Sequence, residues 1–172
     1  NGSLVNAVTR GDGTVGEIVT ENIKTINDIP INLVKPFPKF IEIRGEIFMK
    51  KGDFHKLNKS QLENGKKIFA NTRNASAGSI RQKDTRITKN RHLNFFAFSI
   101  GEYSNDFHFE TQSELLKKFN EMGFLVNNEN KVVNNLIHIN NFYDHILSIR
   151  DKLDYEIDGL AVSYTHLTLP TT

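Results

Sequence analysis

Residues 40–50 read FIEIRGEIFMK, and charged side chains alternate along them. Alternate residues of a β-strand point to opposite faces, so Glu42, Arg44 and Glu46 share one face and isoleucines fill the other. On such a face, a carboxylate can accept a hydrogen bond from a ribose hydroxyl, and a neighbouring arginine can bind a phosphate. The same row can instead form surface ion pairs on a wet face. A glycosidase pair is disfavoured, because Glu42 and Glu46 lie about 13 Å apart along one strand.

Two further arginines, Arg73 and Arg81, flank the small residues NASAGSI. Small side chains let a ligand approach the backbone, with the guanidinium groups directed at phosphate oxygens. Spacing alone favours the alternative, ordinary helix packing with two surface arginines. Residues 66–92 also hold eight Lys and Arg residues against one acid, a net charge of +7 (8 − 1). Such a segment can bind a polyanion such as nucleic acid, or can be a solvated basic loop.

The stretch GDGTVG, residues 11–16, matches the glycine pattern of dinucleotide-binding proteins. The following helix is short and ends at a proline-rich loop, so the required second parallel strand is missing. Asp12 would also place a carboxylate beside a pyrophosphate. We therefore expect a turn that needs glycine dihedral angles here, and keep a Rossmann oxidoreductase as the weaker alternative.

The elements that position these residues are short strands and scattered helices. Asn1-Gly2 predicts a hairpin turn followed by a strand. Further strands are predicted at 40–49, 93–103 and 155–162. Helices are predicted at 17–26, 54–64 (capped by Asp53), 71–82, 111–122 (a Thr111/Glu114 capping box) and 139–152. This mixture predicts an α+β fold of mostly antiparallel sheets with packed helices.

The 172 residues suit one folded domain, with 38% hydrophobic and 24% charged residues. No apolar run approaches the ~20 residues of a membrane span, and no leader is recognised at the N-terminus. The absence of cysteine suits a reducing cytoplasm. No two of the six histidines form a close ligand pair, so we expect no protein-held metal site.

Five stretches together resemble the adenylation domain of bacterial NAD-dependent DNA ligases. They are TRGDGTVGE, EIRGEIFM, FANTRNASAGSIRQKD, NFFAFSIG and YEIDGLAV. They occur in the order of that family, the third is long and highly specific, and the likeness covers nearly all of residues 1–162. The resemblance implies a nucleotidyltransferase core of ATP-grasp-like type.

The resemblance also implies three nucleotide-binding residues. Glu46, in RGE, would contact the ribose, and Arg10, in TRGDG, would hold the phosphate region. Phe98 stands where the family usually has tyrosine, and its ring would stack on adenine without the hydroxyl.

Four residues are implied for phosphate chemistry. Arg73, Arg81 and Arg150 would support nick sealing through phosphate contacts. Asp158, in IDG, would sit near the reacting phosphates and the magnesium ion. In the family, a lysine takes AMP from NAD, the AMP passes to the 5′-phosphate of a nick, and the 3′-hydroxyl then closes the strand. Arginine, lysine and Mg²⁺ neutralise the developing charge.

The partners implied are a nucleotide and nicked double-stranded DNA in replication and repair, and we expect a monomer with no membrane contact. The alternative from another functional class is a non-catalytic nucleic-acid-binding module that uses segment 66–92.

Two motifs of the family are missing. The nucleophilic lysine belongs to a K-x-DG motif, which none of the 172 residues form. Ser163 stands where the family has a second lysine, and residues 163–172, SYTHLTLPTT, fit nothing in the family. We therefore expect a partial adenylation domain at 1–162 that lacks the lysine strand, a non-native tail at 163–172, and no ligase activity for this polypeptide alone.

Overall fold

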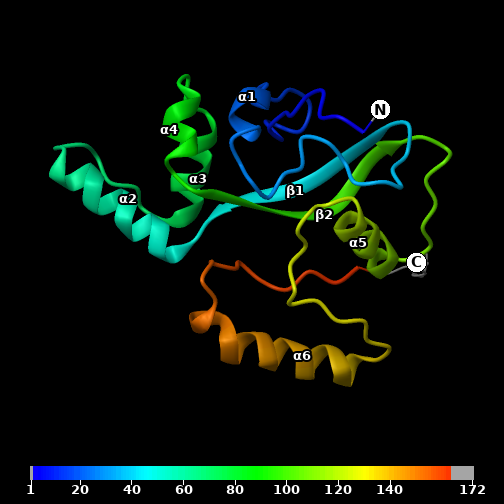
Figure 1. Ribbon diagram of the computed structural model, residues 1–172. Helices are drawn as coiled ribbons and strands as arrows, with labels where there is room; N and C mark the ends of the chain where they lie inside the picture. The colour runs from blue at the N-terminus through cyan, green and yellow to red at the C-terminus, as the bar shows by residue number, and fades with distance from the viewer. Residues whose placement is uncertain (1, 164–172) are drawn as a thin grey trace.

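The two longest predicted strands form the centre of the fold. The computed structural model describes residues 2–163, and in it β1 (Ile41–Met49) pairs antiparallel with β2 (Leu93–Tyr103) (Figure 1). The Cα partners include Glu46 with Phe96 and Met49 with Leu93. The register shifts between Arg44 and Gly45, which places one extra β2 residue at this point. The expected α+β class is confirmed as helices around a small antiparallel sheet.

Helices and connecting segments surround this sheet. They are α1 (Thr20–Ile23), α2 (Lys51–Glu63), α3 (Thr72–Ile80), α4 (Thr85–Lys89), α5 (Gln112–Glu121), α6 (Leu136–Ile149) and the 3₁₀ helix η1 (Arg150–Lys152). In the view of Figure 1, α1 and the N-terminal residues lie above the sheet, whereas α6 and the residues after it lie below.

Side-chain caps explain where several helices begin. The Thr111 hydroxyl accepts a hydrogen bond from the Glu114 amide at the start of α5, which confirms the predicted cap. Asn71 caps α3 in the same way, and Gly123 follows α5 with φ of 101°. The predicted Asp53 cap is wrong, because α2 begins at Lys51 and places Asp53 inside its first turn.

One face of the sheet belongs to the hydrophobic core. Met49, Phe95 and Ala97 are buried there, together with Leu115 and Phe119 of α5. The opposite face, called here the outer face, carries Glu42, Arg44, Glu46 and Phe48 of β1 and Phe96 and Phe98 of β2. The alternation predicted for residues 40–50 is therefore confirmed.

Three predicted elements are wrong or shorter than expected. Residues 155–162 form no strand, because no neighbouring strand among residues 2–163 offers them a hydrogen-bonding ladder. The strand expected after Asn1-Gly2 is reduced to isolated bridges, Ser3 to Asn32 and Val8 to Ile18. The helix predicted at 17–26 is the single turn α1, whose N-cap Val19 offers no side-chain cap.

None of the helices within residues 2–163 has the length and apolar character needed to cross a membrane. The proposed tail lies outside the described residues except for Ser163.

Candidate nucleotide and phosphate site

The outer face of the sheet offers a carboxylate and an aromatic ring to a ligand. Arg44 and Glu42 pair with each other, with 2.8 Å between Nε and Oε1. The exposed carboxylate of Glu46 has no hydrogen bond or ion pair within residues 2–163. The Phe98 side chain is 49% exposed and lies two residues from Phe96, the Cα partner of Glu46. Glu46 and Phe98 are thus diagonal neighbours on one face.

Phe98 owes its position to the register shift and to α5. Arg44 pairs with Ser99 and Gly45 pairs with Ala97, so Phe98 is the extra residue of a β-bulge. The Gln112 side chain at the start of α5 donates a hydrogen bond of 2.7 Å to the Phe98 carbonyl. Bulges re-aim side chains, and here the ring is left open to solvent.

An aromatic cluster lies beside Glu46 on the same face. Phe48 and Phe96 stack with 4.6 Å between ring centroids, and Tyr155 meets each ring edge-on at 5.4 and 5.5 Å. The Tyr155 hydroxyl donates a 3.1 Å hydrogen bond to the side-chain oxygen of Asn127, and partial burial raises the pKa of Tyr155. Tyr155 therefore holds the segment before Asp158 against the sheet. The sequence alone predicts no functional role for Tyr155.

Arg73 and Asp158, both predicted from the resemblance, are brought together. Arg73 Nη1 lies 3.0 Å from Asp158 Oδ2, and both side chains are largely exposed. Next to this pair, the Thr72 hydroxyl hydrogen-bonds to Glu156. Arg150 donates a 3.3 Å hydrogen bond to the Ile157 carbonyl, directly before Asp158. Three of the four predicted phosphate-site residues therefore meet around Asp158.

Arg81, the fourth, lies against the hairpin that carries Arg10. Arg81 Nε is 2.9 Å from Glu17 Oε2. Glu17 exchanges two hydrogen bonds with Thr9, the residue before Arg10. No hydrogen bond or ion pair among residues 2–163 joins the Arg10 or Arg81 side chain to Glu46, Phe98 or Asp158.

The glycine motif at 11–16 is the turn of this hairpin. Val8 and Ile18 bridge antiparallel across it, and Gly11 and Gly13 have φ of 56° and 98°. The Asp12 carboxylate accepts hydrogen bonds from the Val15 and Thr14 amides, which lower the pKa of Asp12. The expectation of a glycine turn is confirmed, and the Rossmann alternative is wrong because the flanking residues pair antiparallel.

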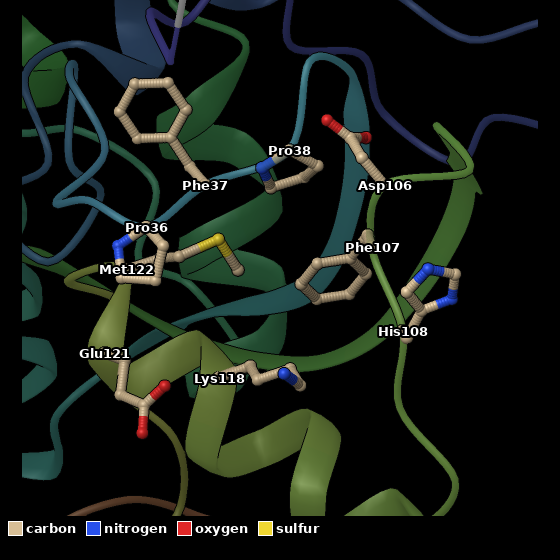
Figure 2. Close-up of a pocket in the computed structure, with 9 residues that line it drawn as sticks. All are labelled: Pro36, Phe37, Pro38, Asp106, Phe107, His108, Lys118, Glu121 and Met122. Atoms are coloured by element: carbon tan, nitrogen blue, oxygen red, sulfur yellow. The ribbon is translucent and has the colours of Figure 1, made fainter.

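Two clefts of the described structure lie away from the outer face. One cleft has a volume of about 210 Å³. Figure 2 shows its lining residues, Pro36–Pro38 and Asp106–His108 together with Lys118, Glu121 and Met122. A second cleft, of about 380 Å³, lies between α1 and residues 82–85. Neither contains a predicted site residue, although the second adjoins Arg81 through Gln82.

The outer face carries the kinds of groups that bind nucleotides, and residues 2–163 give a metal ion few ligands. A free carboxylate beside an exposed ring suits a ribose and a base. Residues 2–163 hold no group of three or more acidic or histidine side chains arranged around a metal. Mg²⁺ commonly takes one or two carboxylates and completes its shell with phosphates and water, a role that the exposed Asp158 fits.

Comparison with known proteins identifies the family of the chain. The family model of the NAD-dependent DNA ligase adenylation domain matches residues 1–171. A DNA ligase of Bartonella tribocorum is 50% identical over 168 residues, which are 98% of this chain and 23% of that protein. A DNA ligase of Neisseria gonorrhoeae is 48% identical over 169 residues, which are 97% of this chain and 20% of that protein. The chain thus spans about a fifth to a quarter of the length of these relatives, and it belongs to the NAD-dependent DNA ligase adenylation domain family.

Proposed function

We propose that this chain supplies the adenylate-binding and nick-binding surface of an NAD-dependent DNA ligase. The parent enzyme would act in the cytoplasm, in DNA replication and repair, with NAD as the adenylyl donor and Mg²⁺ as the metal. The observation that carries the proposal is the outer face of the sheet. There Glu46, whose carboxylate has no ion pair within residues 2–163, and the exposed Phe98 occupy diagonal positions, and Tyr155 holds the segment of Asp158 against the same face.

The adenosine half of the ligand is assigned to β1 and β2. The Phe98 ring stacks on adenine through its exposed face, and the Glu46 carboxylate accepts hydrogen bonds from ribose hydroxyls. The core side of the same strands is tightly packed, so both side chains are presented by rigid backbone. This division explains why one strand is apolar on one face and charged on the other.

The phosphate half is assigned to the four arginines. Phosphoryl transfer concentrates negative charge on oxygen atoms, and fixed guanidinium groups stabilise that charge. Arg73 and Arg150 stand at the Asp158 segment, whereas Arg10 and Arg81 stand at the hairpin. Asp158 would supply one carboxylate to a Mg²⁺ ion, which would add further charge neutralisation.

The 172 residues contain no K-x-DG motif, so we propose that they bind nucleotide and DNA without forming lysyl-AMP. The ATP-grasp-like core and the monomeric state belong to the same proposal. The alternative of a non-catalytic nucleic-acid-binding module gains no support from the relatives, which are named DNA ligase.

Two assays test this function. Equilibrium binding of AMP and of a nicked duplex to the 172-residue chain should be measurable, and DNA binding should weaken steeply with salt. Incubation with adenylyl-labelled NAD and Mg²⁺ should leave no covalent band on a denaturing gel. Absence of both nucleotide and DNA binding would refute the proposed surface, and a labelled band would refute the inactivity.

A further inference from the structure

One short stretch, residues 17–22, holds Arg81 from two sides. The Asn22 side-chain amide donates hydrogen bonds of 2.6 and 2.8 Å to the carbonyls of Ile80 and Gln82, the two neighbours of Arg81. Asn22 is only 7% exposed, and about 60 residues of chain separate it from these carbonyls. The backbone that carries Arg81 is therefore fixed by a buried clamp.

The guanidinium end of Arg81 is held by Glu17. Arg81 Nε lies 2.9 Å from Glu17 Oε2, and the two side chains are 52% and 62% exposed. The Glu17 backbone is itself fixed, since its carbonyl accepts from the Thr9 amide at 2.9 Å and its amide donates to the Thr9 hydroxyl at 3.0 Å. The backbones that carry Glu17 and Arg81 are therefore fixed, whereas the carboxylate and the guanidinium group are open to solvent.

An exposed ion pair of this kind is easily replaced by a stronger anion. Surface pairs contribute little to stability, because water competes with them and salt screens them. A phosphate offers more charge than a carboxylate and matches the guanidinium fork with two oxygens. Glu17 lies at the Nε edge of the guanidinium, so a phosphate that takes this edge displaces the Glu17 carboxylate.

We propose that Glu17 is a positioning residue that occupies the Arg81 guanidinium until a phosphate group, from nucleic acid or from free pyrophosphate, takes its place. The proposal rests on the function assigned above, in which Arg81 binds phosphate. Glu17 keeps the long arginine side chain in one orientation, and its charge lowers the net attraction for nucleic acid. Release of the carboxylate accompanies phosphate binding, with no covalent change.

The substitution Glu17→Gln tests the competition, and Glu21→Gln is its matched control. Glu21 is four residues away, is also exposed, and pairs with Lys24 at 2.7 Å. We expect E17Q to bind a nicked duplex about two- to fivefold more tightly than the unmodified chain, with a salt slope steeper by about one. E21Q should stay within about twofold of the unmodified chain. In an Arg81→Ala background, E17Q should have no effect, because its partner is absent.

A spectroscopic readout separates this inference from the proposed function. In nitrogen-15 spectra, the Arg81 Nε–Hε signal should shift between the unmodified chain and E17Q, because E17Q removes the carboxylate charge that lies 2.9 Å from Nε. Inorganic pyrophosphate should shift this signal at lower concentration in E17Q than in the unmodified chain. A chain that binds pyrophosphate in this way but ignores nicked DNA would refute the proposed function and keep this inference. Equal or weaker binding of pyrophosphate by E17Q would overturn the inference.

Discussion

The Arg73 guanidinium lies 3.0 Å from the Asp158 carboxylate, although 85 residues separate them. Both side chains are largely exposed, so the pair adds little to the stability of the fold. The Thr72–Glu156 and Arg150–Ile157 hydrogen bonds lie next to it, and in the function proposed above this cluster binds phosphate.

Replacement of Arg73 by alanine should therefore change binding more than stability. We expect R73A to lower the free energy of unfolding by less than about 1 kcal/mol, since exposed ion pairs are weak. Nicked-duplex affinity should fall, and the salt slope should become shallower by about one. Urea unfolding and DNA binding as a function of salt check this prediction. A large loss of stability with unchanged DNA affinity would show that the pair is structural.

Gly45 allows β1 and β2 to lie close together, directly before Glu46. A Cβ at this position would lie 2.1 Å from Phe95 Cζ and 2.4 Å from the Phe96 carbonyl oxygen. We expect Gly45→Ala to destabilise the chain by about 1–3 kcal/mol and to weaken AMP binding. Gly52→Ala in α2 is the control, because a Cβ there meets nothing within 4 Å and alanine favours a helix. Equal urea midpoints for the two variants would contradict the close approach.

Loss of the Asn71 cap should both destabilise α3 and weaken phosphate binding by Arg73, which lies in its first turn. Its side chain accepts a 2.7 Å hydrogen bond from the Asn74 amide at the start of α3, next to Arg73. Asn135 makes the same contact at the start of α6, at 2.9 Å. Each alanine variant should lower the free energy of unfolding by about 1 kcal/mol. Only N71A should weaken binding to nicked DNA, and an equal loss in N135A would assign the effect to general destabilisation.

The Asp12 turn should loosen in acid. Hydrogen bonds from the Val15 and Thr14 amides hold the folded-state pKa of Asp12 below its ordinary value of 3.8. Their contribution to stability is therefore complete above pH 3.8 and is lost as the pH falls through the lowered value. The Thr14 and Val15 amide shifts should titrate with a midpoint below 3.8, and a midpoint above it would contradict the turn geometry.

Local chemistry explains which elements were predictable. The strands at 40–49 and 93–103 and the helix after Thr111 carry their own signals, a period of two or a capping box. Residues 155–162 alternate in the same way but form no strand, because a strand also requires a neighbour. A period of two indicates that a segment prefers the strand conformation, but it does not indicate whether a neighbouring strand is present to pair with it.

The site was predictable only through the resemblance. The 85-residue separation of Arg73 and Asp158 and the pairing of Arg81 with Glu17 are tertiary contacts that no spacing reveals. Tyr155 was missed for the same reason, although its position three residues before Asp158 in YEIDG offered a hint. Conversely, the glycines at 11–16 matched a phosphate-binding motif and proved to be a hairpin turn.

The assignment of adenosine to Glu46 and Phe98 is tested most directly by where AMP sits on the folded chain. Nuclear Overhauser effects should connect the adenine protons to the Phe98 ring, together with shifts of the Glu46 amide, and Glu46→Gln should weaken AMP binding while Glu42→Gln does not. AMP contacts confined to the Phe107 and Met122 cleft of Figure 2, with Phe98 unaffected, would contradict the assignment.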